Sequence, residues 1–299
     1  MIQIIKYKWH YLIFSAMLLI PGSIFLVAKG LNLSIDFTGG SVFKYQFTGQ
    51  VDVAELKKVF ESKGVQVEGI INEGNNRYII RAKQVDVKVN NDIKTAVGYA
   101  FNGASQLSFE TVGPAIGAET TKKAFTALFW ASIGILFYIA FAFRNIPKPY
   151  SSFRFGASAI IAMLHDALMV LGVFAAMGYF FKTEVDSLFI TAVLTVIGFS
   201  VHDTIVVFDR IRENLNKLPR SYPFEEVANY SVVETLSRSF ATSWTVVMTL
   251  FALYMLGGET IRTFVFAMLI GVISGTYSSI FTATPILVIW EDWVKKKKH

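Results

Sequence analysis

Six long apolar segments recur along this chain, and they constrain its fold more than any other feature. Each is close to the roughly 20 residues that an α-helix needs to cross a lipid bilayer. Mean hydropathy is +0.48 and only 17% of the residues are charged, which is too apolar for an ordinary soluble domain. The sequence predicts six membrane spans, at about Tyr11–Ala28, Ala124–Phe143, Phe155–Phe181, Leu188–Phe208, Ser239–Gly257 and Thr263–Trp290.

The charges of the chain exclude several classes of function. A net charge of +6 is compatible with nucleic-acid binding, but the basic residues gather at the ends of the apolar segments instead of forming a polar face interleaved with aromatic residues. We therefore expect no nucleic-acid partner.

The chain has no cysteine. Disulfides, thiolate chemistry and cysteine-based zinc sites are therefore excluded.

The first apolar segment follows a basic start, as a secretory signal would. It runs from about Tyr11 to Ala28, which is longer than the apolar part of a typical signal, and no A-x-A-like cleavage site follows it. We predict an uncleaved first span.

Basic side chains also predict the orientation in the membrane, because cytoplasmic connections are enriched in lysine and arginine. With six spans, the basic clusters all fall on one side, which we predict to be the cytoplasm, with both termini there. These clusters are Lys6 and Lys8; Arg144, Lys148 and Arg154; Arg210, Arg212, Lys217 and Arg220; and Lys295–Lys298. The long polar insertion after the first span then faces the opposite side.

That insertion has the patterns of a small α+β domain. Strand-like segments are expected at 41–47, 65–71, 77–83 and 105–112, a turn at 72–76, and helices at 53–64 and 90–101. The order β-α-β-β-α-β predicts a ferredoxin-like extracytoplasmic domain. It holds no histidine and no catalytic cluster, so a docking or positioning role is favoured over an enzymatic one.

The expected fold class is therefore a membrane all-α bundle of six transmembrane helices with an inserted α+β ferredoxin-like domain. The predicted divisions are an N-terminal segment with the first span, the extracytoplasmic domain, the five-helix remainder of the bundle and a basic cytoplasmic tail, at 1–29, 30–121, 122–294 and 295–299.

Ionisable side chains inside the apolar segments are the strongest indication of function. Charges are costly in lipid and normally face a bundle interior or a water-filled path. Asp203 follows His202 in the fourth segment, and Asp166 lies midway along the third. Arg238 opens the fifth segment. We predict a proton relay formed by Asp203, Arg238, His202 and Asp166.

The chemistry of this relay is that of a carboxylic acid in a changing environment. Desolvation favours the neutral acid, whereas an approaching guanidinium favours the charged form. A conformational cycle that moves Asp203 toward and away from Arg238 would therefore take up a proton on one side and release it on the other. A lone arginine near a span end can instead snorkel to the headgroups, and this alternative stays open for Arg238.

The two His-Asp pairs, at 165–166 and 202–203, also occur in metal-dependent phosphohydrolases. Such enzymes need further ligands on soluble helices, which this chain lacks. Neighbouring side chains on a helix diverge by about 100°, so neither histidine is a guaranteed partner of its aspartate. We expect no metal and no cofactor, with a proton gradient as the energy source.

The stretch LNLSIDFTGGSVF (31–43) places a carboxylate and a glycine pair directly after the first span. A nucleotide-binding loop is excluded, because Gly39 and Gly40 do not follow a strand and open a helix. We predict that Asp36, Gly39 and Gly40 form the joint through which movement of the spans reaches the inserted domain.

Motifs over the whole chain resemble the SecD/SecF family of bacterial protein-export membrane subunits, within the RND superfamily. They are SIDFTGG (34–40), VGPAIGAE (112–119), HDALMVLG (165–172), FSVHDTIVVFDRIREN (199–214) and TLSRSFATS (235–243). The fourth is highly specific. The resemblance implies an RND-type half-bundle that pairs with a homologous six-span SecD-like subunit.

The resemblance also implies a function. Members of the family are non-enzymatic subunits of the Sec translocase of the bacterial cytoplasmic (inner) membrane, where lipid surrounds them. They use the proton motive force to promote translocation of a preprotein through the SecYEG channel. By position, Asp203 is the intramembrane proton carrier and Arg238 its cationic partner, and a further acid would come from the SecD-like subunit.

Two residues depart from the family pattern. Glycine is more usual at Ser34, and a non-titrating polar residue is common at His202. An imidazole changes its charge near neutral pH. His202 would therefore add a second proton site or tune Asp203.

Two alternatives stay open. A stand-alone RND-like exporter of lipids or small molecules predicts a complete twelve-span chain or an apolar pocket in the exported domain. A scaffold that only stabilises the channel predicts that Asp203→Asn is tolerated.

Overall fold

The computed structural model describes residues 2–219 and 221–297. Arg220, and residues 298 and 299 of the predicted basic tail, lie outside the described residues. The chain divides into two compact units: Met1–Asn32 together with Ala127–His299, and Leu33–Thr126.

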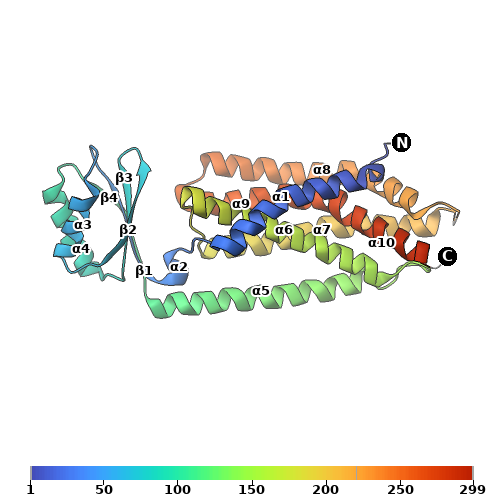
Figure 1. Cartoon of the computed structure of the whole chain (residues 1–299), viewed down its shortest axis with the longest axis horizontal. Helices are drawn as coiled ribbons and strands as arrows, with labels where there is room; N and C mark the ends of the chain where they lie inside the picture. Colours follow the sequence, from blue (N-terminus) through green and yellow to red (C-terminus); the bar gives the residue numbers. More distant parts are fainter. Residues whose placement is uncertain (1, 220, 298–299) are drawn as a thin grey trace. The chain divides into compact units, whose positions relative to one another are not determined.

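The first unit is a bundle of long helices (Figure 1). Among the described residues, six helices are long and apolar enough to cross a membrane, as predicted. They are α1 (Lys8–Lys29), α5 (Pro114–Ala142), α6 (Ser152–Phe181), α7 (Ser187–Lys217), α8 (Phe224–Leu256), and α9 (Glu259–Ser278) continued by η2 (Ser279–Ala283) and α10 (Thr284–Lys297). A short 3-10 helix, η1 (Ile5–Tyr7), precedes α1. The start of α5 belongs to the second unit and its remainder to the first.

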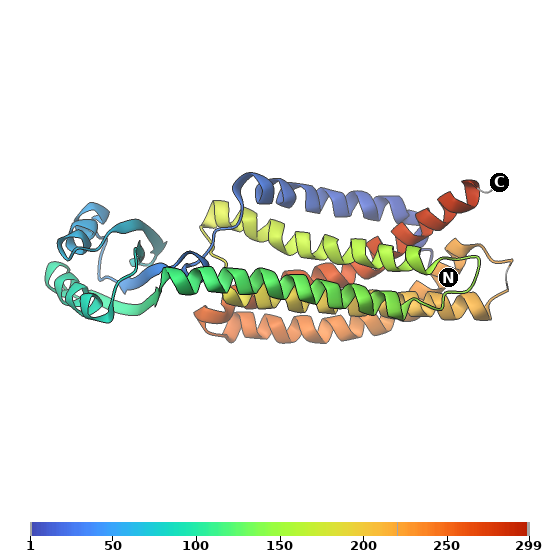
Figure 2. The same ribbon diagram turned by 90° about the horizontal axis from the view of Figure 1, so that it is seen from below.

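The centre of the bundle is α7, which packs against α6, α8 and α9, while α1 packs mainly on α6 (Figure 2). Half of the apolar stretch of α7 is buried, compared with 6% of that of α1 or α5. Apolar side chains that stay outside a protein core indicate contact with lipid or another protein. The outward faces of α1 and α5 therefore fit a membrane environment.

Glycines allow two of these helices to approach their neighbours closely. A Cβ added to Gly172 of α6 would lie 2.8 Å from Cα of Gly22 on α1. A Cβ on Gly271 of α9 would lie 2.1 Å from a methyl group of Val196 on α7. Gly198 of α7 makes no such approach, because a Cβ there would meet no described atom of another helix within 4 Å.

The described residues of the basic clusters lie at one end of the bundle, as expected from a six-span chain. Figure 1 shows the start of α1, the connections from α5 to α6 and from α7 to α8, and the end of α10 at this end, which we call the termini end. Ion pairs tie it together: Lys8 Nζ lies 2.9 Å from Glu225 on α8 and 3.4 Å from Asp292 on α10.

The second unit contains a four-stranded antiparallel sheet with strand order β2-β3-β1-β4. Its elements follow each other as α2 (Ile35–Thr38), β1 (Gly40–Gln46), α3 (Val53–Ser62), β2 (Val67–Gly74), β3 (Arg77–Ala82), α4 (Val87–Ala100) and β4 (Ser105–Val112). Phe43, Tyr45 and Phe60 are fully buried between sheet and helices, where their rings pack edge to face.

The sequence missed three local features. Strand β2 continues to Gly74 into the predicted turn, because Asn75 and Asn76 alone reverse the chain with positive φ values of 50° and 57°. Helix α4 begins at Val87, three residues before the predicted start. The last predicted span contains the π-helical segment η2.

Candidate functional site

Asp203 lies on α7 inside the bundle and is 3% exposed. Among the described residues, its carboxylate accepts one side-chain hydrogen bond, from Ser243 Oγ on α8 to Oδ2 at 3.3 Å. An ionised carboxylate has about four lone-pair sites. Asp203 therefore keeps most of its hydrogen-bonding capacity free for a proton, a water molecule or a mobile cation.

Asp166 lies on α6 and is fully buried, but its surroundings differ. Its carboxylate accepts hydrogen bonds from Ser200 Oγ on α7 at 2.5 Å, from Ser274 Oγ on α9 at 2.7 Å and from Ser278 Oγ on α9. His165 Nδ1 is 3.0 Å from Oδ1. This single carboxylate thus joins three helices of the bundle.

The two histidines also differ. His165 is 7% exposed, and among the described residues its Nε2 has no hydrogen-bond partner. His202 is exposed, although it is adjacent to Asp203 in sequence. Of the two predicted His-Asp pairs, only His165 and Asp166 are in contact in the described part of the chain.

Arg238 is exposed on α8. Among the described residues it forms no ion pair or hydrogen bond with Asp203, so the two relay groups are apart in this structure. Arg238 lines an open cavity of about 590 Å³ between α7 and α8. The other residues of this cavity, which we call the α7–α8 cavity, are Ile205, Val206, Asp209, Arg210, Glu213, Glu234 and Thr235.

The wall of the α7–α8 cavity is fixed by an ion-pair network. Arg210 donates from Nε and Nη2 to the two carboxylate oxygens of Glu234 at 2.6 and 2.7 Å, and from Nη1 to Glu213 at 2.6 Å. Asn214 Nδ2 donates to Glu234 at 2.8 Å. Bidentate arginine-carboxylate pairs are the more rigid kind. The helices are thus held together beside the cavity while Arg238 remains unpaired in the described structure.

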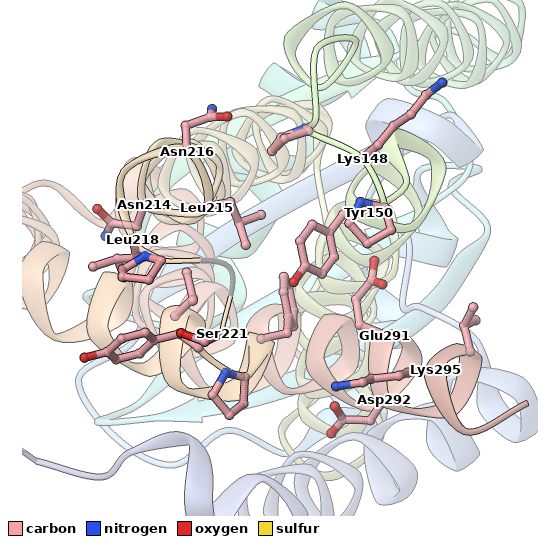
Figure 3. Close-up of a pocket in the computed structure, with 18 of the residues that line it drawn as sticks. Lys148, Tyr150, Asn214, Leu215, Asn216, Leu218, Ser221, Glu291, Asp292 and Lys295 are labelled. Atoms are coloured by element: carbon pink, nitrogen blue, oxygen red, sulfur yellow. The ribbon is translucent and has the colours of Figure 1, made fainter. Parts of the chain in front are cut away.

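A second cavity, of about 570 Å³, lies at the termini end between the connecting segments and α10 (Figure 3). Arg154 closes one side through a bidentate pair with Glu291, at 2.6 and 2.9 Å. Burial and the charge of Glu291 raise the pKa of Tyr150, which also lines this cavity. Its charged groups are of both signs, and none of the predicted relay residues line it.

The predicted joint residues lie in and after the short helix α2. Ser34 Oγ accepts a hydrogen bond from the backbone N–H of Asp36 at 3.2 Å, which caps this helix. Gly39 ends it with a φ of 73°, and a Cβ there would lie 2.9 Å from Cα of Pro114, the first residue of α5. A Cβ added to Gly117 on α5 would lie 2.9 Å from Gly39 N and 3.0 Å from Phe37 O. This close packing of α2 on the start of α5 requires glycine.

Sequence reasoning missed the hydroxyl residues around the two aspartates. Ser274 and Ser278 are four residues apart on α9, and Ser239 and Ser243 are four residues apart on α8. Hydroxyl residues at this spacing share a helix face. Two serines four residues apart inside an apolar segment are the sequence pattern that could have pointed to these polar helix faces. Among the described residues, no group of three His, Cys, Asp or Glu side chains could hold a metal ion.

Comparisons with known proteins identify the family. Residues 92–293 match the family model described as "Protein export membrane protein SecD/SecF, C-terminal", and residues 24–51 match the "SecD/SecF GG Motif". The chain is 44% identical to the protein translocase subunit SecF of Thermobaculum terrenum, over 98% of this chain and 95% of that protein. It is 40% identical to SecF of Anaerolinea thermophila, over 99% and 98%.

A solved structure agrees. The crystal structure of SecDF from Thermus thermophilus, described as a translocon-associated membrane protein, matches with a TM-score of 0.83 and 32% identity. The match covers 97% of this chain and 39% of that one. With six apolar helices among its described residues and relatives that match over nearly their whole length, the chain is a multi-pass membrane protein, and it belongs to the SecD/SecF family of protein translocase subunits.

Proposed function

We propose that this translocase subunit uses the proton motive force to promote preprotein translocation, with Asp203 as the proton carrier. The proposal rests on the surroundings of Asp203. This residue lies in an apolar span, is 3% exposed, and among the described residues its carboxylate accepts a single, long hydrogen bond of 3.3 Å. A charge at such depth is costly unless it is paired or binds a proton.

Arg238 is proposed to act as the mobile counter-charge. It is exposed, and in the described structure no carboxylate holds it, while the neighbouring Arg210 is bound by two. Movement of α8 relative to α7 would bring the guanidinium toward Asp203 and release the proton. Each charge that crosses the full field is worth about 2.3 kcal/mol per 100 mV, so a few protons could drive a substantial movement.

His202 and Asp166 are proposed to have secondary roles in the relay. His202 is exposed beside Asp203 and would tune it or accept a proton from water. Asp166 holds α6, α7 and α9 together through three serine hydroxyls. Its contacts support a positioning role for α7, and we propose that Asp166 serves the relay by holding that helix in place.

The second unit is proposed to be a ferredoxin-like extracytoplasmic domain that holds the emerging preprotein. Its antiparallel sheet order β2-β3-β1-β4 with two helices supports this class. Asp36, Gly39 and Gly40 are proposed as the joint, because α2 packs without side-chain space on the start of α5, a helix that continues as a membrane span.

The partners and location follow from the same proposal. The curated family includes the fused SecDF subunit of Thermus thermophilus, 35% identical over 89% of this chain, which supports a SecD-like partner. We propose that the pair works beside the SecYEG channel in the bacterial cytoplasmic membrane, with both termini cytoplasmic and without enzymatic activity or cofactor. The basic clusters at the termini end support this orientation.

The test uses membrane vesicles that contain the channel, the SecD-like subunit and this chain. A preprotein is arrested part-way with ATP, the ATP is removed, and a proton gradient is applied. We expect the wild-type complex to complete translocation and Asp203→Asn to leave the preprotein arrested. Glu226→Gln, at an exposed carboxylate of α8, is the matched control. Gradient-driven completion by Asp203→Asn at the wild-type rate would contradict the proposal.

A further inference from the structure

A row of buried hydroxyl side chains follows one face of α8 toward Asp203. Thr235, Ser239 and Ser243 are spaced four residues apart and are 7%, 3% and 4% exposed. Residues at this spacing lie above one another on one face of a helix. We call these three residues the hydroxyl row.

The two ends of the hydroxyl row are defined by contacts. At one end, Ser243 donates its hydroxyl hydrogen to Oδ2 of Asp203. At the other end, Thr235 lines the α7–α8 cavity together with Arg238. The row thus begins at an open cavity of about 590 Å³ and ends at a carboxylate that is buried in the bundle.

The middle of the row is a buried polar atom without a partner. Ser239 Oγ forms no hydrogen bond with any residue that the structure describes. Leaving a buried hydroxyl unsatisfied is unfavourable, and such atoms are commonly satisfied by buried water. Ser239 therefore indicates a water position between the cavity and Ser243.

The spacing of the row suits bridging by water. Four residues of α-helix rise about 6 Å, which is too far for a direct hydrogen bond but matches two consecutive hydrogen bonds through one water molecule. A hydroxyl group both donates and accepts hydrogen bonds. Alternating hydroxyls and waters can therefore pass a proton along without any of the hydroxyls becoming charged.

We propose that Thr235, Ser239 and Ser243 form a water-bridged proton path between the α7–α8 cavity and Asp203. The inference rests on the proposed proton-coupled function and assigns the route by which the termini end reaches the carrier. Protons would enter or leave past Arg238, and Ser243 would hand them to Oδ2 of Asp203.

The charged groups around the path are on two helices. From α7, His202, Asp209, Arg210 and Glu213 lie near it, and from α8, Glu234 and Arg238. Helices α9 and α10 and the short η1 also pack on α8. The charged residues of α9, Glu259 and Arg262, lie in its first turn. Neither these two nor the charged residues of α10 and η1, which are Glu291, Asp292, Lys295–Lys297 and Lys6, line the cavity.

The first test measures water access directly and exploits the absence of cysteine from the chain. Thr235→Cys, Ser239→Cys and Ser243→Cys are made one at a time and paired with a cysteine-free SecD-like subunit. A small, charged, membrane-impermeant thiol reagent is added from the termini end. Such reagents attack the thiolate, which forms in water and not in lipid. We expect all three positions to react, with rates that fall from 235 to 243.

The matched control for labelling is Thr245→Cys, a hydroxyl position that is exposed on α8 but is outside the row. We expect it to stay unreactive in a bilayer. Reaction of Ser239→Cys no faster than Thr245→Cys would overturn the proposed path, and this result would say nothing against Asp203 as the carrier.

The second test measures gradient-driven proton uptake by the complex in vesicles. Ser239→Val fills the water position with methyl groups, and we expect at least a tenfold slower uptake; Ser239→Ala, which leaves room for water, should be affected less. Thr245→Val should match the wild type. If Asp203→Asn abolishes uptake while Ser239→Val and Ser243→Val do not slow it, the path is wrong and the carrier stands. If Asp203→Asn leaves uptake intact, the proposed function itself fails.

Discussion

The bundle contains two buried aspartates on adjacent helices whose surroundings are opposites. Asp166 accepts three serine hydroxyl hydrogen bonds from two other helices and contacts His165, whereas Asp203 accepts one hydrogen bond from one helix. Both are almost completely buried, with exposed fractions of 0% and 3%. Burial alone therefore does not distinguish the two carboxylates, but the number of hydrogen-bond donors does.

The difference indicates that the two carboxylates have different roles: Asp166 of α6 holds α7 in place, and Asp203 of α7 is available to bind a proton. Ser200 on α7 is one of the donors to Asp166, and Asp203 lies less than one turn further along the same helix. The contacts of Asp166 fix α7 against α6 and α9 on one side. On the other side, Asp203 faces α8 with free hydrogen-bonding capacity. A proton carrier needs both a rigid support and a carboxylate that can change partners.

The largest expected effect is on gradient-driven transport, when Asp203, the carboxylate with a single hydrogen bond, is replaced. Asp203→Asn preserves size but cannot carry a proton, so gradient-driven completion of translocation should fall at least tenfold, which corresponds to about 1.4 kcal/mol or more. The folded complex should assemble as the wild type does, because only one weak hydrogen bond changes. The arrest assay and co-purification with the SecD-like subunit measure the two properties. Loss of assembly together with transport would give Asp203 a structural role instead.

The second largest effect is expected on the stability of the protein, at Asp166, the carboxylate that accepts three serine hydrogen bonds. Asp166→Ala leaves the buried hydroxyls of Ser200, Ser274 and Ser278 without their acceptor. Side-chain hydrogen bonds within membranes average about 0.6 kcal/mol, so the summed loss should be about 2 kcal/mol in free energy of unfolding. Unfolding of the purified protein in a mixed detergent series measures this quantity. Asp203→Ala, measured in parallel, should lose less than half as much free energy of unfolding. Equal losses in the two variants would show that the two carboxylates do not differ in their structural role.

A smaller effect on stability is expected when single serine hydroxyls that donate to the two aspartates are removed. Ser274→Ala removes a 2.7 Å hydrogen bond to Asp166, whereas Ser243→Ala removes a 3.3 Å hydrogen bond to Asp203. We expect Ser274→Ala to cost about 0.6 kcal/mol or more in the same unfolding assay and Ser243→Ala less. The reverse order would show that the hydrogen-bond geometry does not report the strength of the two sites.

The smallest effect is expected at the exposed histidine. His202→Asn alters an exposed side chain, so stability should change by less than about 0.5 kcal/mol and the rate of gradient-driven export by about twofold at most. The expected change is in the pH dependence of export, because asparagine does not titrate. Export rates measured across a pH series test this. A tenfold loss of export at all pH values would make His202 a carrier in its own right.

The sequence was sufficient to predict the features that depend on composition along one segment. Apolar length predicted six spans, and a charge within an apolar segment drew attention to Asp203. The two-residue turn at Asn75 and Asn76 was placed too early, since β-pairing with β3 extends β2 beyond its apolar residues to Gly74.

Features that depend on contacts between segments could not be predicted. Serine is compatible with any face of a membrane helix, so nothing in one segment showed that Ser200 and Ser274 converge on Asp166. The separation of Arg238 from Asp203 depends on the rotation of α8, which its hydrophobic pattern does not fix, because its apolar residues are spread around the helix.

The central claim is that Asp203 moves protons while Asp166 holds the helices that support it. It is tested most directly by gradient-driven proton uptake, expressed per folded complex, for Asp203→Asn and Asp166→Asn side by side. We predict that Asp203→Asn abolishes uptake without loss of folded protein, and that Asp166→Asn lowers the folded fraction but keeps most of the uptake of each folded complex. Uptake that survives in Asp203→Asn and disappears in fully folded Asp166→Asn would contradict the account.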